Sequence, residues 1–266
     1  MSFVETTRPP SAEATKIADF KPSLLQTEEH HLCPGCGESV AIRLVLEVIE
    51  ELGLAQKNVC VIGHGCYGSF VQIMDVDCTL CLHGRAPAVS TGIKRMRPEV
   101  AVWTLQGDGD MTSEGLAEIL HATARGEDIT CILVNNGVFG DTGGQMTAST
   151  VVGQRTKNTL DGRDPDYHGY PIVIGDMVAS MQGSAYVARG SVHNAASIAK
   201  TKRLIRTGFE RQLERQGLSL VEILTMCPTG WFVPTADGAD YLMESLGKTY
   251  PLGVIKDITK QAEPAD

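Results

Sequence analysis

Residues 99–145 read EVAVWTLQGDGDMTSEGLAEILHATARGEDITCILVNNGVFGDTGGQ, and this stretch decides the fold. The apolar runs at 99–106 and 129–136 predict two buried strands. Between them, Thr112 or Ser113 can cap a helix that closes at a glycine. A strand, a helix and a strand in this order predict parallel neighbours in one sheet, and strands this apolar are covered on both faces.

The same alternation continues in both directions along the chain. Apolar runs predict strands at 58–63, 184–190 and 218–225, and helical spacing predicts helices at 38–53, 89–97, 195–216 and 236–247, with a polar loop at 150–180. We therefore predict one α/β domain with a mostly parallel sheet and helices on both faces. Such sheets bind ligands at the carboxyl ends of their strands, where GHGCYG, GDGD and NNGVFGDTGG all fall.

The composition argues against two classes of protein, those that bind nucleic acid and those that span a membrane. The 266 residues are 42% hydrophobic and 21% charged, with a formal net charge of −9. This balance argues against binding to nucleic acid, which requires clustered Lys and Arg. No apolar run approaches the roughly 20 residues of a membrane span, and residues 1–20 lack the apolar segment of a secretory signal, so we expect a cytoplasmic protein. We expect an N-terminal arm at 1–20, the α/β domain at 21–258 and a tail at 259–266.

The turn Gly107-Asp108-Gly109-Asp110 follows a predicted strand and precedes a predicted helix. Backbone amides there can approach a diphosphate, and a carboxylate can hold Mg²⁺. Taken alone, the motif is more often a plain tight turn. The next strand, however, ends in Asn135-Asn136, which brings a second hard oxygen ligand to the adjacent loop.

Gly-Asp-Gly, a helix and a buried strand ending in Asn-Asn resemble the fingerprint of thiamine-diphosphate enzymes. The resemblance implies the thiamine-diphosphate-binding fold and Mg²⁺ ligation by Asp108, Asn136 and the backbone of Val138. It also implies that the loop Gly140–Gln145 wraps the diphosphate through Thr142 and backbone amides.

Eight cysteines are unusual for a chain expected in a reducing compartment, where they more often bind metal or act in redox chemistry. Cys60 and Cys131 lie inside apolar runs and are expected to be core residues. CPGCGE at 33–38 suits zinc, an iron–sulfur cluster or a redox dithiol. With Cys78 and Cys81 it forms two CxxC pairs, which is typical of a structural zinc site.

A second reading of the cysteines comes from the order of the motifs. CPGCGE, a glycine-rich Cys loop, HGRA, GDGD, NN, TGGQ and a late Cys-Pro resemble the β subunit of 2-oxoacid:ferredoxin oxidoreductases, from about Leu32 to Asp257. The resemblance implies one [4Fe–4S] cluster beside the thiamine cofactor, and soft thiolates suit such a cluster. Its ligands would be Cys33, Cys36, Cys66 and Cys227.

The resemblance also implies a set of residues around the cofactor. Because the cofactor carries the chemistry, the candidates for a catalytic role in the chain itself are only His83, Arg85 and Asp141. The cofactor-binding residues it implies are Glu38, His64, Gly65, Cys66, Tyr67, His83, Gly84, Arg85, Ala86, Asp108, Gly109, Asp110, Asn136, Gly140, Asp141, Thr142, Gly143, Gly144 and Gln145.

Two features depart from the family pattern. Cys78 and Cys81 before HGRA are not expected, and we interpret them as spare buried thiols. Asp141 stands where a neutral residue is more familiar, and its carboxylate would repel a second acid group on a substrate. A branched-chain 2-oxoacid is therefore favoured, with 2-oxoglutarate as the alternative.

The implied activity is the oxidative decarboxylation of a 2-oxoacid with coenzyme A to acyl-CoA and CO₂, with electrons passing to ferredoxin, as in anaerobic metabolism. The resemblance implies an α subunit that binds the pyrimidine of the cofactor, with γ and ferredoxin-like δ subunits as further partners. Two rival hypotheses are a subunit of a non-oxidative thiamine enzyme and a zinc-stabilised module without catalysis. The first has no use for the four thiolates, and the second would leave GDGD as a turn.

Overall fold

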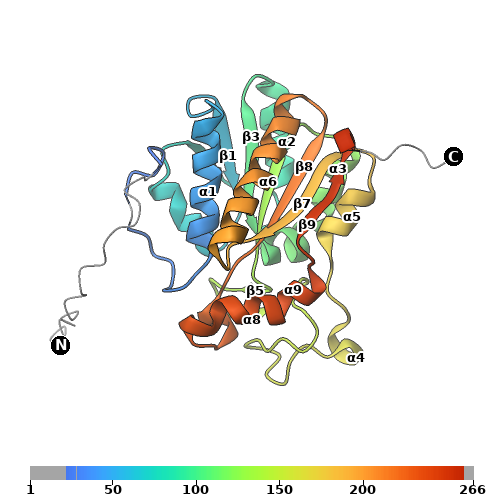
Figure 1. The fold of residues 1–266 in the computed structure, drawn as a ribbon. Coiled ribbons are helices and arrows are strands. Elements are labelled where there is room, and N and C mark those ends of the chain that lie inside the picture. Colours follow the sequence, from blue (N-terminus) through green and yellow to red (C-terminus); the bar gives the residue numbers. More distant parts are fainter. Residues whose placement is uncertain (1–21, 28, 261–266) are drawn as a thin grey trace.

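The structure is a computed structural model that describes residues 22–27 and 29–260. The expected N-terminal arm and most of the expected tail therefore lie outside the described residues. Figure 1 shows a central sheet with helices packed on both of its sides. Among the described residues, no helix is both long enough and apolar enough to cross a membrane.

The sheet has seven strands in the order β2-β1-β3-β4-β8-β7-β9. All neighbouring pairs are parallel except β7 and β9, which are antiparallel. The prediction of a mostly parallel α/β sheet is confirmed. The strands are β1 (Asn58–Ile62), β2 (Asp77–Leu80), β3 (Ala101–Gly107), β4 (Thr130–Asn135), β7 (Ser184–Ser191), β8 (Leu218–Leu224) and β9 (Gly253–Asp257).

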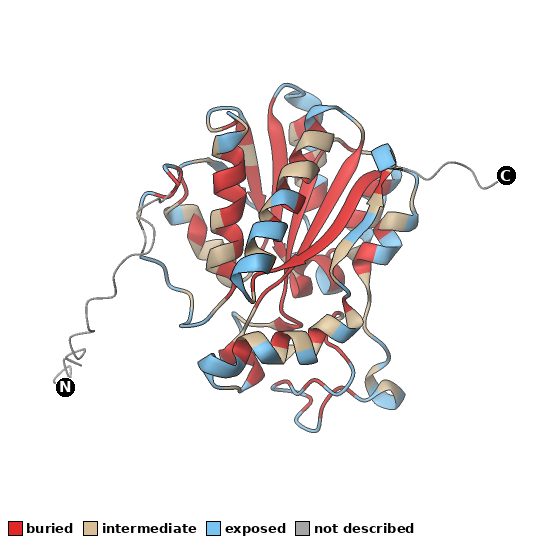
Figure 2. Ribbon diagram, viewed as in Figure 1, coloured by how far each residue is buried: buried red, intermediate tan, exposed pale blue. Residues whose placement is uncertain are grey.

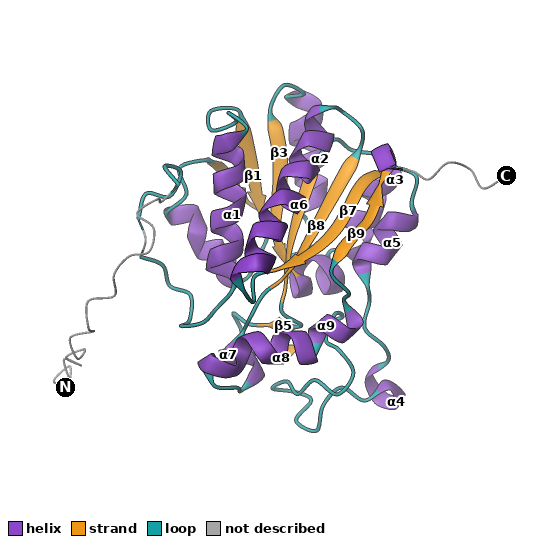
Figure 3. Ribbon diagram, in the orientation of Figure 1, coloured by secondary structure: helices purple, strands orange, loops and turns teal. Residues whose placement is uncertain are grey.

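Helices cover both faces of the sheet, as Figure 3 shows. One apolar cluster joins one face to helices α1 (Glu38–Glu51) and α6 (Ala195–Leu213). A second cluster joins the other face to α2 (Ala86–Met96), α3 (Leu116–Ala124) and α5 (Ile174–Ser180). The central strands β3, β4 and β8 are therefore red along nearly their whole length in Figure 2, as expected for strands buried on both faces.

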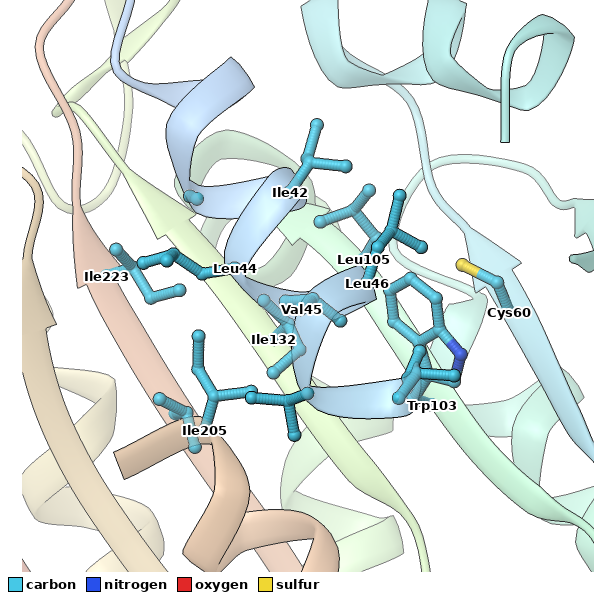
Figure 4. Packing of buried hydrophobic residues seen from close by; sticks show 14 of the residues in the cluster. Ile42, Leu44, Val45, Leu46, Cys60, Trp103, Leu105, Ile132, Ile205 and Ile223 are labelled. Atoms are coloured by element: carbon cyan, nitrogen blue, oxygen red, sulfur yellow. The ribbon is translucent and has the colours of Figure 1, made fainter. Parts of the chain in front are cut away.

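Figure 4 shows how α1 packs on the sheet. Ile42, Val45 and Leu46 point from the helix toward Trp103 and Ile132 of the strands, and all are at most 1% exposed. Cys60 lies at the edge of this cluster and Cys131 lies in the opposite one, both fully buried. The prediction that these two cysteines are core residues is confirmed.

A third, smaller cluster lies at the carboxyl ends of the central strands. There the hairpin β5 (Val138–Phe139) and β6 (Gln145–Met146) packs beside α7 (Pro228–Trp231), α8 (Gly238–Glu244) and α9 (Leu246–Thr249). Its buried residues include Leu224 at the end of β8 and Val138 just after β4. The cluster thus supports the loops that leave these two strands. Figure 1 shows it below the sheet, together with α4 (Pro165–His168).

The structure corrects several sequence predictions. The predicted cap at Thr112 or Ser113 is wrong, because residues Gly109–Glu114 form a π-helical turn and α3 begins only at Leu116. The Thr112 hydroxyl donates back to the Asp108 carbonyl at 2.6 Å, and the Ser113 hydroxyl accepts from the amide of Ala148 at 2.9 Å. Neither hydroxyl is left to cap a helix.

Other differences concern the margins of the sheet. Edge strands β2 and β9 lack a long apolar run and are partly exposed, so hydrophobic patterning did not reveal them. The predicted loop at 150–180 contains α4 and α5, and the predicted helix at 236–247 is divided at Ser245 into α8 and α9.

Candidate active site

The register of the sheet brings three loops to one edge. Gly107 pairs with Val134, and Ile62 pairs with Leu105, so β1, β3 and β4 end at nearly the same level. The loops that follow carry GHGC, GDGD and NNG. This is the expected edge for ligand binding in a parallel sheet.

Asp110 joins these loops through four hydrogen bonds. Its Oδ1 accepts from the His64 amide at 3.2 Å, the Gly84 amide at 2.9 Å and the His83 Nδ1 at 2.9 Å. Its Oδ2 accepts from Gln106 Nε2 at 2.6 Å. The side chain is fully buried. Asp110 therefore fixes the loop after β1 and the HGRA loop against β3, and its oxygens are already occupied by protein donors.

Asp108 has a different environment, beside the loop after β4. Its Oδ1 accepts from the Asn136 amide at 3.2 Å, and its Oδ2 accepts from the Thr147 hydroxyl at 2.5 Å. Burial raises the pKa of this carboxyl to about 7. A buried carboxylate gains from a bound cation, so Asp108 and Asn136 fit the hard oxygen ligands that Mg²⁺ prefers.

Buried side chains of other elements hold the Asn135–Asn136 turn in place. Asn135 Nδ2 donates to Glu222 Oε1 at 2.7 Å, and its Oδ1 accepts from the amide of Gly137 at 3.1 Å. The Asn136 carbonyl accepts from the indole of Trp231 at 2.7 Å, and its Oδ1 accepts from the Val138 amide at 3.0 Å. Gly137 has a φ of +70°, which favours glycine. These contacts hold Asn136 beside Asp108, to which its backbone amide donates.

A cavity opens between these loops. It is lined by most of the residues that the family pattern implied, and by Gly107 and Phe139, which sequence reasoning missed. Its lining is Glu38, His64, Gly65, Cys66, Tyr67, His83, Gly107, Asp108, Gly109, Asp110, Asn136, Val138, Phe139, Gly140, Asp141 and Thr142. Thr147 was also missed, although the hydroxyl-rich run TAST at 147–150 was a signal in the sequence.

The remaining implied residues lie outside this lining. Gly84 contributes only its amide to Asp110, Arg85 forms an ion pair with Glu118 of α3, and Ala86 starts α2. In the loop at 140–145 the Thr142 hydroxyl donates to Gln145 Oε1 at 2.9 Å, and Gln145 Nε2 donates to the Thr142 carbonyl at 2.9 Å. These two hydrogen bonds close the turn from Thr142 to Gln145, which contains Gly143 and Gly144.

A second cavity, of about 260 Å³, is lined by all four cysteines of the implied cluster, Cys33, Cys36, Cys66 and Cys227. The Gly37 amide donates to the Met226 carbonyl at 2.9 Å, which brings the CPGC turn beside Cys227. Gly35 in this turn has a φ of +78°. Four thiols from three separate segments therefore face one space.

The chemistry of this donor set fits an iron–sulfur cluster. Burial raises the pKa of the Cys66 and Cys227 thiols to about 12, so the thiolates need bound cations. Within residues 22–27 and 29–260, no three His, Cys, Asp or Glu side chains are close enough to hold a single metal ion. Four thiolates around a cavity match a cluster, in which each binds a different iron, better than one tetrahedral zinc.

The other CxxC pair takes no part in this cavity. Cys78 pairs with Cys60 across β1 and β2, and a hydrogen bond with Cys60 lowers the pKa of Cys78. The Cys81 thiol contacts the Ile62 carbonyl at 3.4 Å. Both cysteines are half-buried. The described residues therefore do not assemble the two CxxC pairs into one zinc site.

The two cavities share a wall. Glu38, Cys66, Gly140 and Asp141 line both of them. Glu38 is buried, and its Oε1 accepts from Asn136 Nδ2 at 3.2 Å. Burial, and then the charges of Asp108 and Asp141, raise the pKa of Glu38 to about 8. A group in the first cavity would thus lie directly beside a group in the second.

Comparison with known proteins agrees with this geometry. Residues 64–223 match the family of thiamine pyrophosphate enzymes, at its C-terminal TPP binding domain. The 2-oxoglutarate synthase subunit KorB of Archaeoglobus fulgidus is 32% identical over 213 residues, covering 80% of this chain and 75% of that protein. The chain belongs to this family of 2-oxoacid oxidoreductase subunits that bind thiamine pyrophosphate.

Two further proteins, named as 2-oxoacid oxidoreductases, are also similar to this chain over most of its length. The ketoisovalerate oxidoreductase subunit VorA of Methanothermobacter marburgensis is 37% identical over 235 residues, covering 88% of this chain and 49% of that protein. The 2-oxoglutarate:ferredoxin oxidoreductase of Magnetococcus marinus, solved with 2-oxoglutarate, coenzyme A and succinyl-CoA, has a TM-score of 0.72 at 25% identity, covering 94% of this chain and 88% of that one. The chain thus spans about half the length of the VorA relatives.

Proposed function

We propose that this chain is the β subunit of a 2-oxoacid:ferredoxin oxidoreductase that converts a 2-oxoacid, coenzyme A and an oxidised ferredoxin to acyl-CoA, CO₂ and a reduced ferredoxin. The observation that carries the proposal is the shared wall between the carboxylate-lined cavity and the cavity of four thiols. A non-oxidative thiamine enzyme would need only the first cavity.

The chain's own residues would hold two cofactors in fixed positions. Asp108, Asn136 and the Val138 carbonyl would bind the Mg²⁺ of thiamine diphosphate, while Cys33, Cys36, Cys66 and Cys227 would bind one [4Fe–4S] cluster. When bound, these groups supply the decarboxylation chemistry and the one-electron acceptor, respectively. The buried loops after β3 and β4 would position the diphosphate and exclude water from it.

The substrate that we favour is a branched-chain 2-oxoacid. Asp141 is exposed and lines both cavities, so its carboxylate would lie close to a substrate bound where the two cavities meet. A second carboxylate there would be repelled. The relative VorA is named for ketoisovalerate, which agrees with this choice. 2-Oxoglutarate is the second candidate, because several KorB relatives are named for it.

We further propose that the chain acts in the cytoplasm within a larger complex. An α subunit would supply the pyrimidine-binding half of the site, and γ and ferredoxin-like δ subunits would complete the path to ferredoxin. The naming of the relatives as subunits supports this assembly. In this arrangement residues 21–258 form the catalytic domain, with an arm before it and a tail after it.

The test is a cofactor analysis of the intact complex, purified without oxygen, in the wild type and in two matched variants. We expect about four iron and four sulfide on this chain after subtraction of partner clusters. Cys227→Ser should lose them, whereas Cys78→Ser should keep them, because Cys78 lies outside the thiol cavity.

Other results would redirect the proposal. Zinc in place of iron in the wild type would exclude the oxidative mechanism. Thiamine diphosphate without either metal would favour the non-oxidative enzyme. Equal iron in both cysteine variants would show that the cluster ligands lie elsewhere.

A further inference from the structure

His83 has the arrangement of a general base that is oriented by a carboxylate. Its Nδ1 lies 2.9 Å from Oδ1 of Asp110, which is fully buried. A carboxylate oxygen accepts, so Nδ1 carries the proton in this bond, and Nε2 of the neutral ring is left with its lone pair. A buried acid that fixes the tautomer and the orientation of an imidazole is the arrangement found in catalytic dyads and triads.

The carboxylate of Asp110 is fully engaged by groups of the protein itself. Its remaining bonds come from the amides of His64 and Gly84 and from the side chain of Gln106. The loops are packed tightly around it, since a Cβ on Gly63 would lie 2.0 Å from its Oδ2. The ring of His83 is therefore held by a rigid anchor rather than by a mobile surface group.

The side chain of His83 is accessible both from the cofactor cavity and from solvent. The ring lines that cavity, and 43% of the side chain is exposed. The ring of His64 lies beside it, with the two centroids 5.0 Å apart. Within the described residues, Nε2 of His83 has no protein partner. A second substrate that enters the cavity from solvent can therefore reach this ring.

The other ionisable groups of the cavity are less suited to accept a proton. Glu38 is buried inside the wall, Asp108 is placed for a cation and Asp110 is saturated with donors. Asp141 is exposed, and within the described residues no hydrogen bond orients its carboxylate. His64 lines the cavity too, but within the described residues no carboxylate holds its ring.

We propose that His83, oriented by Asp110, is the general base that takes the proton from the thiol of coenzyme A during acyl transfer. This proposal rests on the proposed function. After two electrons have passed to the acceptor, the thiol sulfur would form a C–S bond to the acyl carbon. The C–C bond that joins the acyl carbon to thiamine diphosphate would break, and its electron pair would stay with the cofactor as the leaving group. The S–H bond of the thiol breaks, and the proton moves to Nε2 of His83. The product is the thioester, and the proton then leaves to solvent through the exposed side of the ring.

The test compares two rates in the intact complex with 2-oxoisovalerate as substrate. One is the single-turnover release of CO₂ without coenzyme A, and the other is steady-state acyl-CoA formation. His83→Asn keeps a donor that can reach Asp110 but has no base at the outer position. We expect acyl-CoA formation to fall by about 100-fold or more, and at least ten times further than CO₂ release. His121→Asn, an exposed histidine on α3, is the matched control and should change neither rate.

His83→Gln separates the base from a purely structural contact. Gln reaches outward but gives up the bond to Asp110, and it too lacks a base, so we expect the same selective loss. If His83→Asn forms acyl-CoA at the wild-type rate, or if both rates fall equally, His83 is not the base. A wild-type complex that neither releases CO₂ nor forms acyl-CoA would instead refute the proposed function itself.

Discussion

The ion pair between Arg189 and Glu222 connects the core of the sheet to the cofactor loop. Arg189 Nε donates to Glu222 Oε2 at 2.6 Å, and both side chains are 1% exposed. The other carboxylate oxygen accepts from Asn135 Nδ2 at 2.7 Å. Arg189 also donates to the Pro251 carbonyl at 3.1 Å. The pair thus joins β7 and β8 and secures the end of β4.

Arg189→Met keeps the apolar stem of the side chain but leaves the Glu222 carboxylate buried with one hydrogen bond. Breaking one side of a buried pair costs about 3–5 kcal/mol, because the remaining charge is uncompensated. We expect the free energy of unfolding, measured by urea titration with far-UV circular dichroism, to fall by that amount with an unchanged m value. Adding Glu222→Gln removes the charge and should restore at least half of the loss.

Arg97→Met is the control, since Arg97 and Glu99 form a pair with 64% and 59% exposed side chains. An exposed pair contributes less than about 1 kcal/mol. If Arg189→Met costs no more than this control, or if Glu222→Gln restores nothing, the uncompensated charge is not the cause. The inference that this pair secures the end of β4 through Asn135 would then lose its support.

Three further predictions concern the loops around the site. Burial raises the pKa of Asp108 from 3.8 to about 7. Between these two pH values the metal-free folded chain keeps a proton on Asp108 that the unfolded chain releases. The free energy of unfolding should therefore fall as the pH rises from about 4 to about 7. Urea unfolding at pH 4.5 and pH 7.5 in a chelator should show a smaller drop for Asp108→Asn than for the wild type; an equal drop refutes this assignment. Asp141→Asn should raise kcat/KM for 2-oxoglutarate relative to 2-oxoisovalerate by roughly tenfold, which is about 1.4 kcal/mol; no change in the ratio would show that Asp141 does not face the substrate. Arg163 is 5% exposed and donates to the carbonyls of Thr150 and Tyr170 at 2.6 and 2.7 Å, which holds the loop at 150–170 together. Arg163→Ala should therefore make this loop sensitive to limited proteolysis. Unchanged cleavage would show that Arg163 does not hold the loop.

The fold and the centre of the site could be predicted because their signals are local. The runs at 99–106 and 129–136 are too apolar to lie at a surface, and a parallel sheet then forces GDGD and NN to one edge. Because of this shared edge, Asp108 and Asn136 were predicted to lie in adjacent loops. In the structure the backbone amide of Asn136 donates a hydrogen bond to the Asp108 carboxylate. Whether they hold Mg²⁺ stays a prediction.

The rest depends on contacts that spacing along the chain does not encode. Arg85 and Asp110 were both predicted beside the cofactor, and this stays a prediction. What spacing did not reveal is their partners: Arg85 pairs with Glu118 on the next helix, and Asp110, which lines the cavity, bonds to two other loops. The helix cap failed for a similar reason, because the Thr112 and Ser113 hydroxyls found partners outside the helix start. Short polar side chains choose among nearby donors and acceptors, and that choice is made by tertiary packing.

The shared wall also couples the electrostatics of the two cavities. Glu38 holds its proton at neutral pH because burial and the charges of Asp108 and Asp141 raise its pKa to about 8. When Glu38 is ionised, its charge is among the causes that raise the pKa of the Cys66 and Cys227 thiols. A cation at Asp108 would cancel one of the charges that keep Glu38 protonated. A cation bound in the first cavity would therefore favour the ionised form of Glu38, on the wall that the thiols also face.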